Sequence, residues 1–307
     1  RIPGQTMEDK RRYFMGNFDH IRLQLTREPR GDRDLLAALL TEATSDEGEF
    51  GLVFMDARRY PYLCGHATIG AVTTLIETGN LPADGPERVV IVDTPSGPVK
   101  TTAHIHEDRV TSVATTAVPS FVYESDTALF IPGLGKITVD TVCVGGFFVM
   151  VSTREIGLDL VPENGPAFIS LGMSIIEEAN RQLNVEHPTR PGVTTVDVVE
   201  FYDPGTDDQG LGRNAVVYGE SHLDRSPCGT GTAAKLTLLH SKGLLDVGTP
   251  FYNQSLLGSR FEGRVTGTTK VGHLDGVRVE IIGSAHITGV HEFVLDPRDP
   301  FPQGFLL

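Results

Sequence analysis

The sequence predicts an α/β protein built from two pseudo-symmetric domains. Its 307 residues exceed what a single typical core needs, which favours two domains. Short β-branched runs alternate with stretches of helical periodicity, as expected for a mixture of strands and helices. A strand-to-helix unit that begins with Cys-Gly occurs twice, at Cys64 and at Cys228, and this repeat indicates two similar domains related by a pseudo-two-fold axis.

The first expected element is a helix close to the N-terminus. Thr6-Met7-Glu8-Asp9 has the pattern of a capping box, in which a hydroxyl accepts from a free backbone N–H and an acidic side chain favours the positive helix end. Apolar residues then recur at helical spacing, at Phe14, Phe18, Ile21 and Leu25. The helix is expected to end near Pro29, because proline keeps its predecessor out of helical angles.

Strands and a second helix complete the first half. A short β run at residues 51–55 leads to Cys64, and a helix is expected from there to Gly79. Three β runs follow, VVIVDT, VKTTAHI and VTSVATT, with turn residues between them. The pattern restarts around Pro119. We therefore assign residues 1–118, together with residues 290–307, to a first domain that carries Cys64.

The second half, residues 119–289, is expected to form a second domain that carries Cys228. Strands are predicted near residues 137–142 and 147–151. A helix follows Pro166 and carries its apolar face at Phe168, Leu171, Ile175, Ala179 and Leu183. Two more β runs, VTTVDVVEF and NAVVY, lead to the turn that contains Cys228.

The two cysteine segments match each other position by position. CGHATIGAVTTLIETGNL starts at Cys64 and CGTGTAAKLTLLHSKGLL starts at Cys228. They share Cys-Gly, then a threonine, a leucine and a glycine at equal spacings. The shared glycines, Gly79 and Gly243, stand where a helix takes its left-handed C-terminal cap. Both cysteines are therefore expected to open equivalent helices.

Composition and charge describe an ordinary globular protein with an acidic surface. Hydrophobic residues make up 39% and charged residues 21% of the chain, so extensive disorder is not expected. The formal net charge of −14 argues against nucleic acid or an anionic membrane as a partner. The longest apolar runs have about ten residues, whereas a membrane span needs about 20, and no secretory signal is recognised at the N-terminus.

Three cysteines, Cys64, Cys143 and Cys228, are too few and too scattered for a disulfide framework or a metal site. We therefore expect no bound metal and a reducing, cytoplasmic setting. Cys143 lies in an apolar strand run without a Cys-Gly helix start, so it is interpreted as a core residue. Either of the other two, taken alone, could equally be a small buried hydrophobe, but their matched contexts favour a shared function.

A cysteine at a helix N-terminus gains specific chemistry. The unpaired N–H groups and the helix dipole lower the pKa of a thiol and attract a carboxylate, and the glycine beside each cysteine lets backbone amides approach a ligand. If two such thiols flank the Cα of one substrate, one removes its proton while the other delivers a proton to the opposite face. This inverts the stereocentre, and it requires no cofactor.

Other interpretations of these residues remain open at this stage. His66 could serve as general base for a nucleophilic Cys64, as in a hydrolase or acyl transferase. Asp224 could accept local turn hydrogen bonds or hold a substrate ammonium, and we favour the second. GTGT with Lys235 has the wrong order for a phosphate-binding loop, and no lysine stands out for a pyridoxal-phosphate enzyme. The helix ends could also merely bind an amino acid without catalysis.

At these two motifs the sequence resembles the proline racemase family, which includes proline racemases and 4-hydroxyproline 2-epimerases, and more distantly diaminopimelate epimerase. The matching segments are MDARRYPYLCGHATIG and DRSPCGTGTAAK, with IPGQTM, REPRGD, NAVVYG, SLLGSRFEGRV and HITGVHEFVLDPRDPFPQGFLL, so they cover nearly the whole chain. The resemblance implies the diaminopimelate-epimerase-like fold, in which each of two domains wraps β-strands around a central helix and the active site lies between the domains. It also implies a homodimer.

The resemblance implies cofactor-independent catalysis by Cys64 and Cys228 on free proline or hydroxyproline. The positions that match substrate-binding residues of the family are Gly65, His66, Asp224, Gly229 and Thr230. Relatives that dehydrate trans-3-hydroxy-L-proline usually replace one cysteine with serine or threonine. Both cysteines are present here, so racemisation or epimerisation is favoured over dehydration.

The sequence departs from the family pattern in three places. The family's first strand, normally ahead of the segment that begins at Ile2, is not in the sequence. Phe147 follows Gly145-Gly146 where relatives often have asparagine, so a polar group expected near the pocket is absent. Tyr218 resembles the aromatic pocket residue of proline racemases more than the small residue of many hydroxyproline epimerases, although its hydroxyl could reach a ring hydroxyl.

Overall fold

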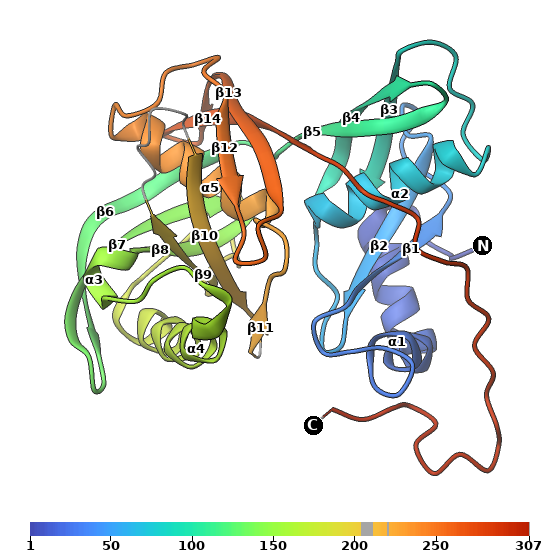
Figure 1. The fold of residues 1–307 in the computed structure, drawn as a ribbon, viewed down its shortest axis with the longest axis horizontal. Helices are drawn as coiled ribbons and strands as arrows, with labels where there is room; N and C mark the ends of the chain where they lie inside the picture. The colour runs from blue at the N-terminus through green and yellow to red at the C-terminus, as the bar shows by residue number, and fades with distance from the viewer. Residues whose placement is uncertain (204–210, 220, 307) are drawn as a thin grey trace. The chain divides into compact units, whose positions relative to one another are not determined.

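The structure, a computed structural model, describes residues 1–203, 211–219 and 221–306. The chain divides into two compact units (Figure 1). Unit 1 contains Arg1–Thr115 and Gly283–Leu307, and unit 2 contains Thr116–Ile282. None of the helices in the described ranges is both long and apolar enough to cross a membrane.

Unit 1 contains a five-stranded sheet and two helices. In order of pairing, the strands are β1 (Leu36–Thr41), β2 (Phe50–Asp56), β3 (Glu87–Thr94), β4 (Gly97–His106) and β5 (Arg109–Thr116). β2 and β3 run parallel, and the other neighbours are antiparallel. The helices are α1 (Met7–Thr26) and α2 (Gly65–Glu77). The C-terminal segment returns to this unit, where Glu28 and Phe305 exchange two backbone hydrogen bonds.

Helix α1 begins as its sequence predicts, and of its predicted apolar face Phe14, Phe18 and Ile21 belong to the core of this unit whereas Leu25 does not. The Thr6 hydroxyl accepts from the backbone N–H of Asp9 at 3.1 Å, and the Asp9 carboxylate accepts from the Thr6 N–H at 3.0 Å, which completes the capping box. Met7 and Phe14 are buried against Val53 and Met55 of β2. Every residue of β2 is buried, so this strand forms the centre of the unit.

Unit 2 is a closed ring of strands. Pairing runs β6, β7, β8, β9, β10, β12, β13, β14, and the ring closes where Val277 of β14 pairs with Ser120 of β6. The bounds are β6 (Ser120–Ile131), β7 (Gly135–Val144), β8 (Gly146–Ser152), β9 (Val196–Asp203), β10 (Leu211–Tyr218), β12 (Phe251–Gln254), β13 (Arg260–Val271) and β14 (Leu274–Gly283). The short strand β11 (His222–Leu223) pairs with β10. Two one-turn helices, α3 (Thr153–Ile156) and η1 (Pro162–Asn164), follow β8.

Two long helices complete unit 2. Helix α5 (Gly229–Ser241) contacts β6, β7, β8 and β13, and ten of its thirteen residues are buried, so it occupies the inside of the strand ring (Figure 1). Helix α4 (Gly165–Gln182) packs on β9 and β10. Its predicted apolar face is confirmed, because Phe168, Ile175 and Ala179 are fully buried. Unit 2 therefore shows the predicted arrangement of strands around a central helix.

We expect Thr6→Ala to lower the free energy of unfolding by about 1 kcal/mol, because it leaves N-terminal amides of α1 without their side-chain acceptor. Urea denaturation measures this change. The adjacent exposed Gln5→Ala serves as control and should leave the midpoint unchanged. Equal midpoints for both variants would show that the capping box contributes nothing to stability.

Candidate functional site

Cys64 stands at the start of α2, as predicted. It is the N-cap residue, with an ordinary extended backbone at φ −145°, and it is 8% exposed. Its carbonyl accepts from both the backbone N–H and the hydroxyl of Thr68, at 3.1 and 2.8 Å. The predicted C-terminal cap is also found, because Gly79 has φ +72°. Gly65 and His66 occupy the first two helical positions beside the thiol.

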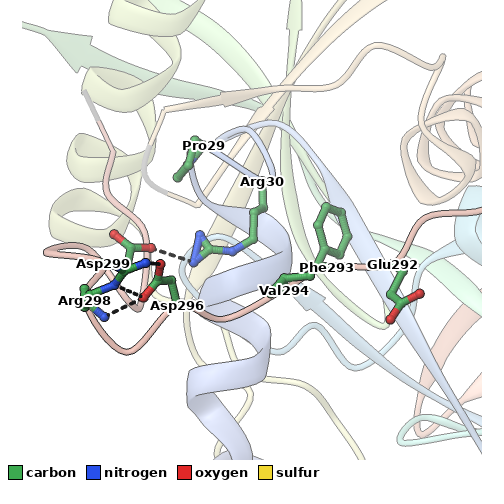
Figure 2. Close-up of a pocket in the computed structure, with 8 residues that line it drawn as sticks. All are labelled: Pro29, Arg30, Glu292, Phe293, Val294, Asp296, Arg298 and Asp299. Carbon is green, nitrogen blue, oxygen red and sulfur yellow. Dashed lines mark hydrogen bonds and ion pairs between the residues drawn. The ribbon is translucent and has the colours of Figure 1, made fainter.

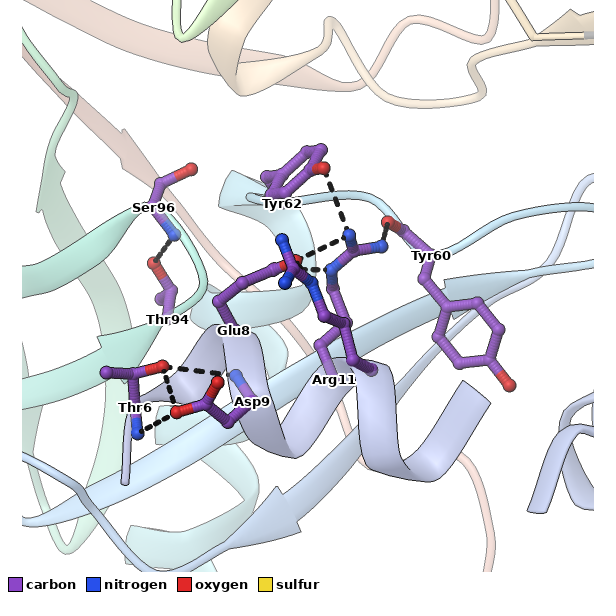
Figure 3. Close-up of polar contacts among 9 residues, drawn as sticks. Thr6, Glu8, Asp9, Arg11, Tyr60, Tyr62, Thr94 and Ser96 are labelled. Atoms are coloured by element: carbon purple, nitrogen blue, oxygen red, sulfur yellow. Dashed lines mark hydrogen bonds and ion pairs between the residues drawn. The ribbon is translucent and has the colours of Figure 1, made fainter. Parts of the chain in front are cut away.

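The loop that delivers Cys64 is fixed by Arg11 of α1 (Figure 3). The buried Arg11 guanidinium donates to the Tyr60 carbonyl and to the Tyr62 hydroxyl, both at 3.0 Å, and it lies over the Tyr62 ring. Glu8, one turn earlier, accepts from the same guanidinium at 2.7 Å. These contacts hold Tyr60 and Tyr62, which precede Cys64, against the N-terminal half of α1.

We expect Arg11→Met to keep the apolar stem but to lower the free energy of unfolding by about 1–3 kcal/mol, because the Tyr60 carbonyl loses its donor. Amide hydrogen exchange of residues 57–64 should accelerate. Arg12→Met is a matched control, because Arg12 bonds the same Glu8 but its side chain is 69% exposed. Its effect should stay within about 0.5 kcal/mol. Equal effects of the two variants would contradict a specific role for Arg11.

Cys228 also caps a helix, but its backbone is strained. It precedes α5 with φ +59° and ψ 118°, a region that residues with a Cβ rarely adopt. Its sulfur accepts from the Gly231 N–H at 3.3 Å and lies 3.4 Å from the Thr230 hydroxyl. Gly243 has φ +70° and closes α5 as Gly79 closes α2, so the predicted equivalence of the two helices is confirmed.

Burial raises the pKa of the Cys228 thiol well above its ordinary value, and the negative charge of Asp224 adds to this effect. Hydrogen bonds from Thr230 and Gly231 oppose the rise but do not cancel it. A helix N-terminus alone predicts a lowered thiol pKa, so this expectation is wrong for Cys228. The physical reason is that the thiol is withdrawn from water, which disfavours the thiolate.

The other predicted residues of unit 2 lie around the start of α5. Asp224 accepts from the backbone N–H and the hydroxyl of Ser226, at 2.9 and 2.8 Å, and Ser226 in turn accepts from the Cys228 N–H at 3.0 Å. Asp224 thus shapes the turn that leads to Cys228, whichever further role it has. Gly229 and Thr230 begin the helix. Tyr218 ends β10, where its ring stacks on His222 at 5.0 Å between centroids.

A buried polar network that the sequence did not reveal lies behind Cys228. It consists of Glu200 on β9, Asn214 on β10, Asn253 on β12, and Thr232 and Lys235 on α5, all at most 1% exposed. The Lys235 ammonium donates to the carbonyl of Arg213 and the amide oxygen of Asn253, at 3.0 and 3.2 Å. Burial raises the pKa of Glu200 to about 8 and lowers that of Lys235 to about 8. The sequence does contain a signal of this network, because a single charged residue lies inside each of the apolar runs VVEFY and AAKLTLL.

Glu200→Gln should remove a pH dependence of stability. The pKa of Glu200 is about 8 in the folded protein, against an ordinary value of 4.5, so the folded state holds the extra proton between these values. Its stabilising contribution is complete below pH 4.5 and is lost as the pH rises through 8. Without Glu200 the pKa of Lys235 falls further. This also lowers the stability of the wild type relative to the variant as the pH rises.

Urea denaturation of wild type and Glu200→Gln at several pH values measures this effect. We expect the free energy of unfolding of the wild type, relative to the variant, to decrease between about pH 4.5 and 8 and then to level off. A difference that stays constant across this range would show that Glu200 is ionised in the folded protein throughout.

The remaining cysteine and the surface pocket are separate from these residues. Cys143 of β7 is fully buried in the core beneath α4, and burial raises its pKa to about 12, which confirms its interpretation as a core residue.

A pocket of about 560 Å³ in unit 1 lies between Arg30 and the C-terminal segment (Figure 2). Arg30 forms an ion pair with Asp299 there at 3.2 Å. The pocket contains none of the predicted site residues. In the described part of the chain, no cluster of three His, Cys, Asp or Glu side chains could hold a metal ion.

Comparison with known sequences gives one family over the whole chain. The family described as Proline racemase matches residues 1–306. The chain is 39% identical to a proline racemase of Acetoanaerobium sticklandii, over 99% of the chain and 91% of that protein. It is 36% identical to a 4-hydroxyproline 2-epimerase of Streptosporangium roseum, over 100% of the chain and 92% of that protein. It is 34% identical to a trans-3-hydroxy-L-proline dehydratase of Bacillus thuringiensis, over 100% of the chain and 91% of that protein.

Comparison with solved structures agrees. A hydroxyproline epimerase from Agrobacterium vitis, with bound trans-4-hydroxy-L-proline, superposes with a TM-score of 0.91 at 32% identity, covering 100% of this chain and 88% of that one. A PhzF-family protein of Bacillus anthracis shares the fold at a TM-score of 0.58 and 12% identity, covering 88% and 87% of the two chains. The predicted fold class is thereby confirmed.

Proposed function

The chain belongs to the proline racemase family, and from this premise we propose that it is a cofactor-independent racemase or epimerase that inverts the Cα of free proline or 4-hydroxyproline. Membership of the family and the names of its full-length relatives support an isomerase. The proposal rests mainly on one observation that occurs twice in the chain: Cys64 and Cys228 each occupy the N-cap position of a thirteen-residue helix.

In the proposed reaction the two sulfur atoms exchange protons with one carbon. The Cys64 thiolate removes the Cα proton and becomes a thiol, while the Cys228 thiol delivers its proton to the opposite face and becomes a thiolate. The raised pKa of Cys228 supports its entry into this half-reaction as the protonated partner. Reaction of the opposite enantiomer then starts from the reversed protonation states, so atoms and charge balance over the cycle.

The helix ends supply the second requirement of the reaction. As the Cα proton leaves, negative charge develops on the substrate carboxylate, and free backbone amides at a helix N-terminus stabilise it without reorganisation. Gly65 and Gly229 leave these amides open because they lack a Cβ. In this proposal His66 and Thr230 contact the substrate beside the thiols, and Asp224 pairs with its ammonium.

The substrate is proposed at the level of proline or 4-hydroxyproline. The epimerase of Agrobacterium vitis with bound trans-4-hydroxy-L-proline supports a ring amino acid. Tyr218, at the end of β10, favours proline if its ring packs on the substrate, whereas its hydroxyl would favour 4-hydroxyproline. The homodimer implied by the family is part of this proposal, and sedimentation equilibrium tests it.

Dehydration of trans-3-hydroxy-L-proline is the alternative supported by a specific finding, because a relative of that name aligns along the whole chain. It is less favoured, since both cysteines are present here. A hydrolase or acyl transferase with a nucleophilic Cys64 rests only on His66, which lies two residues further along the same helix start.

Incubation of the pure protein in heavy water with L-proline, trans-4-hydroxy-L-proline or trans-3-hydroxy-L-proline tests the proposal. We expect deuterium at Cα together with a change of optical rotation for one or both of the first two compounds. Formation of a cyclic imine from the third compound alone would indicate the dehydratase. The absence of exchange with every substrate would contradict catalysis and leave only amino-acid binding.

Cys64→Ser and Cys228→Ser should each lower the rate of racemisation at least about 100-fold, because a serine hydroxyl is a far weaker acid than a thiol, so near neutral pH it neither ionises to act as the base nor readily donates its proton. Cys143→Ser provides a control for cysteine loss, since Cys143 is fully buried in the hydrophobic core of unit 2. Polarimetry measures all three variants. Full activity of either of the first two variants would contradict the two-thiol mechanism.

A further inference from the structure

A buried carboxyl that the proposed mechanism does not use lies close to the start of α5. Glu200 is fully buried, and its Oε1 accepts from the side-chain amide of Asn214 at 2.9 Å. Its other oxygen, Oε2, is buried without a hydrogen-bond partner among the described residues. A carboxyl placed in this way is costly to bury, so its retention calls for a physical reason.

Asn214 connects this carboxyl to the backbone of Cys228. The same amide nitrogen that bonds Glu200 also donates to the carbonyl of Pro227, at 2.7 Å. The Thr232 hydroxyl is a second donor to this carbonyl, at 3.2 Å. The residue that follows is Cys228, in its strained conformation with φ +59°. Such a conformation persists only where the surroundings determine it fully, and the anchored Pro227 carbonyl provides this constraint.

Gly231 provides a second and direct connection. A Cβ on Gly231 would lie 2.7 Å from Oε2 of Glu200 and 3.1 Å from the Cβ of Cys228. Because Gly231 has no Cβ, the second carboxyl oxygen of Glu200 and the side chain of Cys228 can both pack against it. A negative charge on Glu200 also raises the pKa of Cys228, as expected for two acidic groups so close together.

We propose that Glu200 is a positioning residue for Cys228: its carboxyl orients Asn214, which anchors the strained cysteine backbone, and its second oxygen lies against Gly231 beside the cysteine. This inference rests on the proposed function, in which Cys228 delivers and removes the substrate proton. Its consequence is that Glu200, which does not touch the substrate, opposes ionisation of Cys228 once Glu200 itself is ionised, above about pH 8.

Three other charged groups act in this region. Asp224, on the turn before α5, also raises the pKa of Cys228. Lys235, on α5, favours the carboxylate of Glu200, and Asp203 of β9 favours the charge on Lys235. Because a change of Glu200 leaves Asp224 in place, it removes one of two negative neighbours of the thiol. The pKa of Cys228 should therefore fall in the variant but remain above that of an exposed cysteine.

The test measures Cys228 directly, without substrate. The rate of alkylation of Cys228 by iodoacetamide is followed from pH 6 to about pH 11 by peptide mass mapping, in wild type and in Glu200→Gln. We expect the midpoint to be lower in the variant, so that alkylation between about pH 8 and the midpoint is faster than in wild type. An unchanged midpoint would overturn the proposal.

Glu178→Gln is the matched control, because Glu178 is a buried glutamate of the same unit that lies on α4. It should leave the alkylation profile of Cys228 unchanged, and an equal shift in this variant would refute a specific effect of Glu200. If Glu200→Gln does not fold, the alkylation profile of the wild-type protein tests the proposal instead. Coupled ionisation of Glu200 and Cys228 should make this wild-type profile broader than a single titration, and a single sharp titration would contradict the proposal.

The anchoring role has its own readout. At pH 7, Glu200→Gln should keep the turnover number within about threefold of wild type, because an amide oxygen still accepts from Asn214. Glu200→Leu should lower the turnover number at least tenfold with little change in KM, because Asn214 loses its orienting partner. Equal turnover in the two variants would refute anchoring through Asn214.

Failure of this inference is distinguishable from failure of the proposed function. If the wild type exchanges deuterium into proline but Glu200→Gln leaves the midpoint of Cys228 alkylation unchanged, only the role of Glu200 is refuted. If the midpoint shifts but no exchange is found, the proposed racemase activity is refuted, while the effect of Glu200 on the Cys228 thiol stands.

Discussion

The hydrogen bond from the fifth residue of each Cys-Gly motif back to the cysteine carbonyl is the constraint on which the rest of the structure depends. Thr68 donates to Cys64 at 3.1 Å and Thr232 donates to Cys228 at 2.8 Å. This first turn places each thiol at the positive end of a helix, beside free backbone amides. A sulfur atom and an anion-binding group thus occur together twice in one chain, and this pairing is what acid–base chemistry on an amino acid needs.

The two cysteines reach this position by different physical means. Cys64 has a relaxed backbone and depends on Arg11, which holds the preceding loop from outside the sheet. Cys228 has a strained backbone and depends on side chains buried inside the strand ring, chiefly Asn214 and Glu200. Burial in that ring raises the pKa of Cys228, although the thiol lies at a helix N-terminus. Equivalent sequence motifs therefore give thiols in unequal surroundings.

Local signals explain what the sequence could predict. The capping box at Thr6, the apolar face of α4 and the left-handed glycines Gly79 and Gly243 each depend on a few neighbouring residues, and each is found. The positive φ of Cys228 was not predictable, because a Cβ-bearing residue gives no local sign of it. The buried network was also missed, because its members come from four separate elements and meet only when the ring of strands closes.

A crystal structure with trans-4-hydroxy-L-proline bound would test the central claim most directly, because inversion by two thiols fixes where both sulfur atoms must lie. We expect the Cα to have one sulfur on each face, both at about 3.5 Å, with the carboxylate on the backbone amides of the two helix starts. A ligand whose Cα meets only one sulfur, or meets both on the same face, would contradict this mechanism.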